Sequence, residues 1–477
     1  MVKLQVASVA LAWGIAAVAG GGRCVAQQAE APKAQATPEP EAHGFFPRLG
    51  QFYREDWSGT AASGPAPARR GAPSPLDSPP FPSADWSYGG SPVIGEPDTN
   101  SYPLMTAILG AERLSRSRIK VYGWLDPSVN VGTSAKSNSP EANDLYSRRL
   151  ELNQAVVYVE RLPDSVQQSH VDWGFHLTAL YGTDYRFTTD RGYLSSQLID
   201  HNRRYGFDPS LEYVDLYLPK VAQGMNLRVG RFISIPGIEA QLSPNNYFFS
   251  HSLLYAVDPF TDTGVLATVK LNDRWLVQAG ITAGHDVAPW VEDAKPSATA
   301  CISYTSASVN DNLYACLNGI NSGKYAYNNL QQYDLTWYHR FSKKVHMATE
   351  AYYMYQRDVP ALGGPIAPQA NTNAVPCLPG HTTCTAPVYA VVNYVLRELS
   401  PHTFVGFRSD YLNDFKGQRT GYATQYSENT LALSHWFGST IQLRPEVRFD
   451  RAWNRKAYDN GTKHNQFTAA SDLVIHF

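Results

Sequence analysis

The chain has 477 residues, enough for two or three soluble domains or for one large membrane barrel. Hydrophobic residues make up 43% of the chain and the mean hydropathy is −0.32, which is too polar for a bundle of membrane-spanning helices. The 29 Tyr, 19 Phe and 10 Trp favour strands with one face in water and one in lipid, and the net charge of −2 does not indicate a nucleic-acid partner.

The first 26 residues predict a secretory signal peptide. An apolar run over residues 4–22 follows a positive charge, and small residues precede the expected cleavage after Ala26. A lipoprotein anchor on Cys24 is the alternative, which Arg23 directly before it disfavours. Loss of residues 1–26 removes two positive charges and no acid, so the charge changes from −2 to −4.

Residues 27–92 are rich in Pro, Ala, Gly and Ser, and we expect a disordered periplasmic tail there. Residues 93–117 form a pre-barrel segment. Within it, Met105–Arg116 has the pattern of a short amphipathic helix. We expect this helix to pack at the rim of a barrel, and insertion into the lumen is the alternative.

From residue 118 to residue 477, segments of alternating polar and apolar residues recur, separated by polar or turn-like stretches. This period of two predicts strands. We therefore predict an all-β fold, a transmembrane antiparallel β-barrel of about 16 strands. The expected strands are 118–131, 150–161, 171–185, 211–219, 224–234, 261–271, 274–284, 298–307, 311–321, 329–341, 344–357, 387–398, 402–414, 421–436, 438–451 and 464–477.

The links between these strands alternate in length. Short links follow even-numbered strands, for example at residues 271–274 and 437–438, whereas links after odd-numbered strands are longer. Bacterial outer-membrane barrels combine short periplasmic turns with long outer loops in this way. Both ends of the barrel are therefore expected on the periplasmic side of a Gram-negative outer membrane.

The last strand ends at an aromatic residue, Phe477. Phe467, Leu473 and Ile475 share its parity, while the polar residues Gln466, Thr468, Asp472 and His476 have the other parity. This pattern resembles the closing strand of an outer-membrane barrel, whose final residue acts as an assembly signal for the barrel assembly machinery. We expect Phe477 at the lipid interface.

The same alternation selects candidate pore-lining residues. On strand 438–451, Arg444, Glu446, Arg448 and Asp450 share one parity, and a shift by one residue would place these four charges in lipid at about 2–4 kcal/mol for each Arg near the midplane. These charges predict a wet lumen with a transverse field, and wall charges that only pair with one another are the alternative. The candidates are Lys120, Arg228, Asp334, Arg340, Glu350, Arg408, Asp410, Arg444, Glu446, Arg448 and Asp450.

Two long links are candidates for a constriction. Leu194–Gly206 has the pattern of a short helix, and Pro236–His251 is the second candidate. Either segment would narrow the lumen if it folded inward. Loops that rest on the rim are the alternative.

Four cysteines remain after removal of the signal peptide. The close pairs Cys301 with Cys316 and Cys377 with Cys384 predict two local disulfides in an exported protein. The first would tie neighbouring strands near one rim, and the second would close a small loop. A zinc site is the alternative, although the spacing lacks paired CxxC motifs.

The sequence does not indicate an enzyme, a cofactor or a metal site. GxSxG, HExxH and Walker motifs are absent, and the fragments Ser250–His251 and His285–Asp286 are ordinary polar pairs. We therefore expect no catalytic, cofactor-binding or metal-binding residues.

Several segments from about Phe81 onward resemble the family of outer-membrane β-barrel porins of the OmpL-like type. They are FPSADWSYGGSPVIGEPDTNSYPL, SRIKVYGWLDPSVNVGTS, NLRVGRFISIPGIE, FTDTGVLATVKLNDRWLVQAGIT, LYACLNGINSGK and NNLQQYDLTWYHRF. The resemblance implies a diffusion pore in the outer membrane, and it brings no binding residues to this sequence.

The leading hypothesis is a porin for passive diffusion of small hydrophilic solutes through a charged lumen. The alternatives are a structural or interaction barrel closed by its loops, and a barrel enzyme. Outer-membrane lipid and small polar solutes are the expected partners. A homotrimer is a further expectation, by analogy with other sixteen-stranded porins.

Overall fold

The computed structural model describes residues 42–59, 70–71, 93–94, 101–165, 167–308, 310–322, 328–363, 374–400 and 402–477. The expected signal peptide and most of the expected tail lie outside these residues. Among the described residues, no helix combines the length and the apolar composition needed to cross a bilayer.

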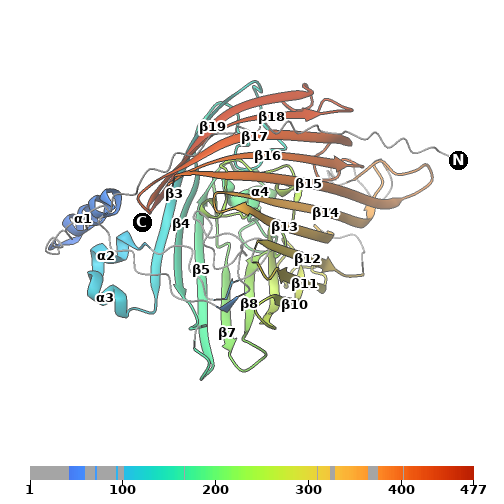
Figure 1. Ribbon diagram of the computed structural model, residues 1–477. Helices are drawn as coiled ribbons and strands as arrows, with labels where there is room; N and C mark the ends of the chain where they lie inside the picture. The colour runs from blue at the N-terminus through green and yellow to red at the C-terminus, as the bar shows by residue number, and fades with distance from the viewer. Residues whose placement is uncertain are drawn as a thin grey trace, which may run out of the picture. The chain divides into compact units, whose positions relative to one another are not determined.

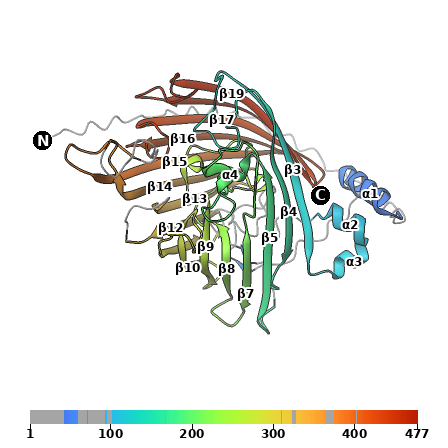
Figure 2. The same cartoon turned by 180° about the vertical axis from the view of Figure 1, so that it is seen from behind.

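The strands of the barrel follow one another around a closed antiparallel sheet, which Figures 1 and 2 show from opposite sides. Seventeen strands take part, but β6 and β7 both pair with β5 and share one position, so the barrel has sixteen positions. The strands are β3 (Lys120–Gly132), β4 (Leu150–Arg161), β5 (Asp172–Gly182), β6 (Gly206–Asp208), β7 (Glu212–Leu218), β8 (Met225–Ile233), β9 (Thr261–Lys270), β10 (Trp275–His285), β11 (Ser297–Thr305), β12 (Asp311–Ile320), β13 (Gln331–Ser342), β14 (Val345–Pro360), β15 (Thr383–Ser400), β16 (Thr403–Asp414), β17 (Thr424–Phe437), β18 (Ile441–Ala452) and β19 (Asn465–His476).

The sixteen-strand prediction is thus confirmed, with small shifts in strand ends. The main difference is β6, which the sequence pattern left in a loop. Pro209 follows β6 and has no N–H to donate to the ladder, which accounts for the break before β7.

The barrel closes where β19 pairs with β3. Beyond the end of β19, Phe477 N–H donates to Gly123 O at 2.9 Å, and Gly123 N–H donates to Phe477 O at 3.1 Å. A side chain at Gly123 would place its Cβ 1.9 Å from Val156 O and 2.9 Å from Phe477 Cζ. The close approach of three chain segments therefore requires glycine at this position.

The predicted alternation of faces is also confirmed. On β18 the even-numbered residues from Gln442 to Asp450 are buried, while Pro445, Val447 and Phe449 are exposed. Large apolar residues are exposed in the same way on strands all around the barrel, for example Leu177, Val214, Leu335, Leu431 and Val447. A continuous apolar exterior of this kind is typical of a barrel surrounded by lipid.

The links between strands alternate between short and long, as predicted. Links at one end of the barrel are short, such as 343–344 and 438–440, and we name this the short-turn end. Links at the other end include 133–149, 183–205 and 234–260, and we name it the long-loop end. The link 162–171 is longer than the other short turns.

Three short helices precede the barrel: α1 (Phe45–Ser58), α2 (Pro103–Leu109) and α3 (Ala111–Arg116). The predicted helical stretch Met105–Arg116 forms two helices, α2 and α3, separated at Gly110, and Val121 N–H of β3 donates to Met105 Sδ at 2.9 Å. α1 lies within the segment that we expected to be disordered, so that expectation is wrong for Phe45–Ser58.

α1 is attached to the short-turn end beside the closing strand. Asp56 accepts hydrogen bonds from Ser439 N at 3.0 Å and from Thr440 Oγ1 at 2.7 Å. Tyr53 Oη donates to His476 O at 2.7 Å. The tertiary contacts account for a helix in a segment whose composition does not predict one.

Candidate functional site

The long link between β8 and β9, residues 234–260, folds into the barrel, and we name it the inward loop. All of its residues are buried except Ile235, Glu239, Ala256 and Phe260, which are partly buried. It contains two short 3₁₀ turns, η2 (Ser243–Asn245) and η3 (Tyr255–Val257). Of the two predicted constriction candidates, this is the one that enters the lumen.

The other candidate, Leu194–Gly206, stays near the long-loop end. It contains the short helix α4 (Ser196–Ile199), which is partly exposed. Gln197 Nε2 donates to Phe207 O at 3.0 Å, so the segment folds back on β6.

Three buried arginines from the wall hold the backbone carbonyls of the inward loop. Arg444 Nη1 donates to Ser243 O at 2.7 Å, and Arg448 Nη1 donates to His251 O at 2.6 Å. Arg408 Nη1 donates to Ser250 O. The loop lacks regular structure, so these guanidinium groups supply hydrogen bonds that its own backbone does not.

Wall carboxylates hold the amide groups of the same loop. Glu350 accepts a hydrogen bond from Ile238 N at 2.8 Å, and Asp410 accepts one from Leu253 N at 2.8 Å. Glu446 accepts one from Ser250 N at 3.1 Å. Positive wall residues thus bind loop carbonyls and negative wall residues bind loop amides.

The three arginines are also neutralised by carboxylates on the same strand or on a neighbouring strand. Arg408 pairs with Glu428 at 3.1 Å and Arg448 with Asp450 at 2.9 Å, while Arg444 forms a hydrogen-bonded pair with Asp472. All three guanidinium groups are at most 1% exposed. The paired-charge interpretation therefore holds for these candidates, which brace the wall and the loop together.

Apolar contacts complete the attachment of the inward loop. Ile238, Phe248 and Leu253 belong to one buried cluster with tyrosines of the wall. Among these, Tyr352 Oη donates to Leu254 O at 2.9 Å. The loop is therefore packed in one cluster with residues of β13–β18, as a core element and not suspended in the lumen.

The remaining predicted pore-lining residues lie in three places. Lys120 is at the short-turn end, where its Nζ donates to Leu114 O at 2.9 Å. Arg228 on β8 pairs with Asp215 on β7 at 3.0 Å. Asp334 and Arg340 lie on β13, Asp334 buried and Arg340 partly buried near the short-turn end. A role in lining a conducting pore stays a prediction for all eleven candidates.

Some residues that hold the inward loop were missed. Ser243 N–H donates to Gln154 Oε1 at 3.0 Å, and Ser243 Oγ donates to Asp126. Both wall residues have the inward parity of predicted strands, so the alternation could have identified them. The wall tyrosines carry no charge, so a search for charged residues on the inward face did not select them.

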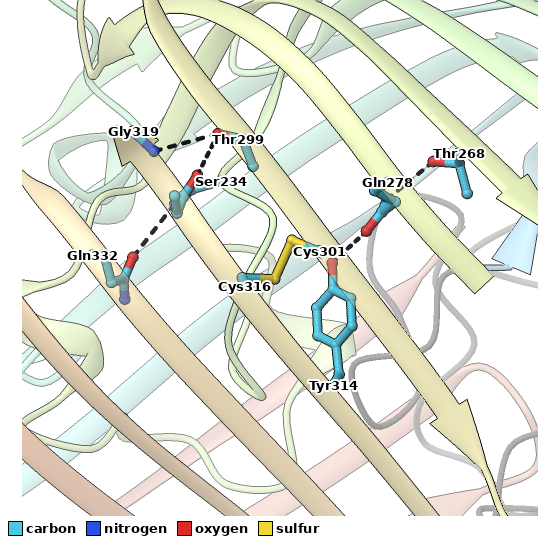
Figure 3. Close-up of a disulfide and its surroundings, with 10 residues drawn as sticks. Ser234, Thr268, Gln278, Thr299, Cys301, Tyr314, Cys316, Gly319 and Gln332 are labelled. Atoms are coloured by element: carbon cyan, nitrogen blue, oxygen red, sulfur yellow. Dashed lines mark hydrogen bonds between the residues drawn. A yellow bond between two sulfur atoms is a disulfide. The ribbon is translucent and has the colours of Figure 1, made fainter. Parts of the chain in front are cut away.

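Both predicted disulfides are formed. Cys301 and Cys316 are direct partners on β11 and β12 (Figure 3), and Cys377 and Cys384 close a seven-residue separation. The first pair lies in the middle of its strands, so its expected place near a rim is wrong.

Polar side chains surround the first disulfide (Figure 3). Tyr314 Oη donates to Gln278, whose Nε2 donates to Thr268 Oγ1 at 3.0 Å. On the other side, Asn318 Nδ2 donates to Ser234 Oγ at 3.0 Å, at the start of the inward loop. Around this disulfide the wall thus presents uncharged polar groups.

A cavity of about 180 Å³ lies among the links of the long-loop end. Asp286 is one of its lining residues and accepts hydrogen bonds from Phe260 N at 3.0 Å and from Thr261 N at 2.8 Å. Burial raises the pKa of Asp286 to about 6. The lining residues are Arg186, Thr189, Leu198, Phe260, Asp286, Asn328, Gln356, Gln418 and Arg419.

The two polar pairs noted in the sequence have structural contacts. His285 Nδ1 lies 2.7 Å from Asp262 Oδ1, and His251 Nε2 donates to Ala240 O at 2.9 Å. Within the described ranges, no group of three or more His, Cys, Asp or Glu side chains is arranged to hold a metal ion.

The sequence from residue 118 to residue 477 matches the family described as "Putative beta-barrel porin-2, OmpL-like". The chain belongs to this family. The match includes every strand of the barrel, and it confirms the resemblance found in the sequence. No curated protein matches the chain.

Solved porin structures are similar to this chain at low sequence identity. The anion-selective porin from Comamonas acidovorans has a TM-score of 0.48 and 9% identity, over 75% of this chain and 99% of that chain. The outer-membrane channel DcaP of Acinetobacter baumannii has a TM-score of 0.48 and 11% identity, over 75% and 97%. The trimer form of OmpT from Vibrio cholerae has a TM-score of 0.42 and 10% identity, over 75% and 98%.

Proposed function

We propose that this protein is an outer-membrane porin that lets small hydrophilic solutes diffuse passively past the inward loop. The family assignment supports the porin class. The single observation that supports a size-limited passage is the inward loop itself, buried inside the closed barrel and held by wall charges. The short-turn end would face the periplasm, and the long loops would face outward.

The polar side of the barrel supports a route for hydrophilic solutes. The inward loop belongs to an apolar cluster with residues of β13–β18, whereas β9–β12 present amides and hydroxyls such as Thr268, Gln278 and Asn312. A solute that carries hydroxyl or amide groups would exchange its water hydrogen bonds for contacts of this kind. The cavity at the long-loop end would serve as the outer entrance.

The closed structural barrel is the second candidate. It is favoured by the depth of the loop packing, since Leu253 and Leu254 are each only 1% exposed. In this alternative the loop seals the barrel, and the protein acts through its loops or its periplasmic helices.

Conductance measurements distinguish the two candidates. Ile233 and Thr261 are direct partners on β8 and β9, so a two-residue turn can replace residues 234–260 without stretching the chain. For a porin, the wild-type protein in planar bilayers gives stepwise currents, and the variant without the loop gives larger steps and admits larger sugars in liposome swelling.

The opposite results are equally clear. If the folded wild-type protein is silent and only the loop-free variant conducts, the barrel is closed and the porin proposal is wrong. Silence of both folded proteins would contradict any pore. Heat-dependent mobility in gel electrophoresis verifies that each variant is folded before it is tested.

A further inference from the structure

The buried charges of this barrel are strongly unbalanced. Among the described residues, 23 Asp and Glu side chains are buried, against four arginines and no lysine. The four arginines, Arg231, Arg408, Arg444 and Arg448, are all engaged in ion pairs. Most of the buried carboxyl groups therefore lack a buried positive partner.

The imbalance is sharpest along the inward face of β13. Asp334, Thr336 and Tyr338 lie on this face, and we name them the β13 strip. Asp334 is 5% exposed; its carboxyl group lies against that of Glu350, and no other described residue donates to its oxygens. The hydroxyl groups of Thr336 and Tyr338 are buried and also lack a hydrogen-bond partner there.

Such groups require a partner from solution. A buried polar atom without a hydrogen bond costs about 1–3 kcal/mol, and more if it is charged. Alternate residues of a strand are about 6.6 Å apart, so the strip places three oxygen-bearing side chains in a row along the barrel wall. Oxygen atoms of this kind bind water and hard cations.

Two further carboxylates lie beside the strip. Glu350 on β14 is the direct partner of Thr336, and Asp258 belongs to the inward loop. A Cβ at Gly237 would lie 3.6 Å from Glu350 Oε2 and 3.9 Å from Asp258 Oδ2, so both carboxylates flank one glycine of the loop. Asp334 interacts electrostatically with both of them.

Arg340 shares the inward parity of β13 but lies six residues from Asp334, near the short-turn end. Arg419 is the positive residue that acts on Asp258, but its Nε donates to Val257 O at 3.0 Å and its Nη1 to Asn328 at 2.7 Å. Like charges in a weakly polar interior repel strongly and favour any positive ion that enters. The same negative charges would repel an anion.

We propose that the β13 strip, with Glu350 and Asp258, is a binding step for small monovalent cations and makes the pore prefer cations to anions. This inference rests on the proposed porin function and names the class of solute. The described residues contain no metal-binding group of three or more ligands, which fits passage of a cation in place of tight coordination.

Reversal potentials in a KCl gradient across a planar bilayer test the inference. The reversal potential of the wild-type current should be shifted toward the equilibrium potential of K⁺. This shift corresponds to a permeability ratio of K⁺ to Cl⁻ above one. D334N and E350Q keep the side-chain shape and should each lower this ratio at least threefold. D273N, in an exposed turn at the short-turn end, is the matched control and should leave the ratio unchanged.

Each result has one meaning. A conducting wild-type protein that prefers Cl⁻ overturns the cation site but leaves the porin function standing. Unchanged ratios in folded D334N and E350Q also overturn the site. Absence of current in the folded wild-type protein contradicts the porin function itself, and the cation step with it.

Discussion

Replacement of Arg444 by Met should destabilise the barrel more than any exposed substitution on the same strand. Arg444 is 1% exposed, forms a hydrogen-bonded pair with Asp472 and donates to Ser243 O and Asn246 O of the inward loop. The variant leaves a buried carboxylate without its partner and releases two loop carbonyls. Loss of one partner of a buried pair costs about 3–5 kcal/mol, so we expect about 4 kcal/mol.

A double variant separates the charge from the packing. In R444M/D472N the unpaired carboxylate is gone, and the loss of stability should fall to about 2 kcal/mol, which reflects the released carbonyls. R451M on β18 removes an exposed arginine and should cost less than about 1 kcal/mol. Guanidinium denaturation of detergent-refolded protein, followed by tryptophan fluorescence, gives the free energies of unfolding.

Two results would refute this reasoning. If R444M costs no more than R451M, the pair contributes nothing beyond a surface contact. If the double variant is as unstable as R444M, the cost does not come from an unpaired Asp472, and the bracing role assigned to the pair is wrong.

Two further predictions concern stability. Replacement of Cys301 and Cys316 by serine should lower the free energy of unfolding by about 3 kcal/mol, as expected for a cross-link over 15 residues. Equal denaturation midpoints for this variant and the oxidised wild type would contradict the prediction. Burial raises the pKa of Asp286 to about 6, so its folded state binds a proton more tightly than the unfolded chain. Protonated Asp286 therefore contributes up to about 3 kcal/mol to the free energy of unfolding. This contribution is complete below about pH 4 and is lost as the pH rises through 6. The free energy of unfolding of D286N should decline less between pH 4 and pH 7 than that of the wild type. An equal decline in both proteins would exclude Asp286 as the cause.

The alternation of polar and apolar residues was sufficient to predict the barrel. On β18 the four charges from Arg444 to Asp450 have the inward parity, and the cost of placing them in lipid leaves one register. The same rule placed Asp334 and Glu350 on the inward face before their neighbours were known. Local sequence carries this information because each strand meets water on one face and lipid on the other.

The path of the inward loop could not be predicted in this way. Its contacts with Arg408, Arg444 and Arg448 join positions 158 to 201 residues apart, and no period in the loop sequence records them. The alternation gave the face of each arginine but not its partner. The helix α1 was missed for a related reason, since it is held by contacts with the link 438–440 and with β19.

The attachment of α1 has a consequence for the order of assembly. Its docking surface on the barrel includes Ser439, Thr440 and His476, which belong to the last part of the chain to be made. The helix leaves the secretion channel first, yet its site exists only after the final hairpin is formed. Docking of α1 therefore occurs only once the barrel is complete. An early segment of the polypeptide takes its final place after the last segment has folded.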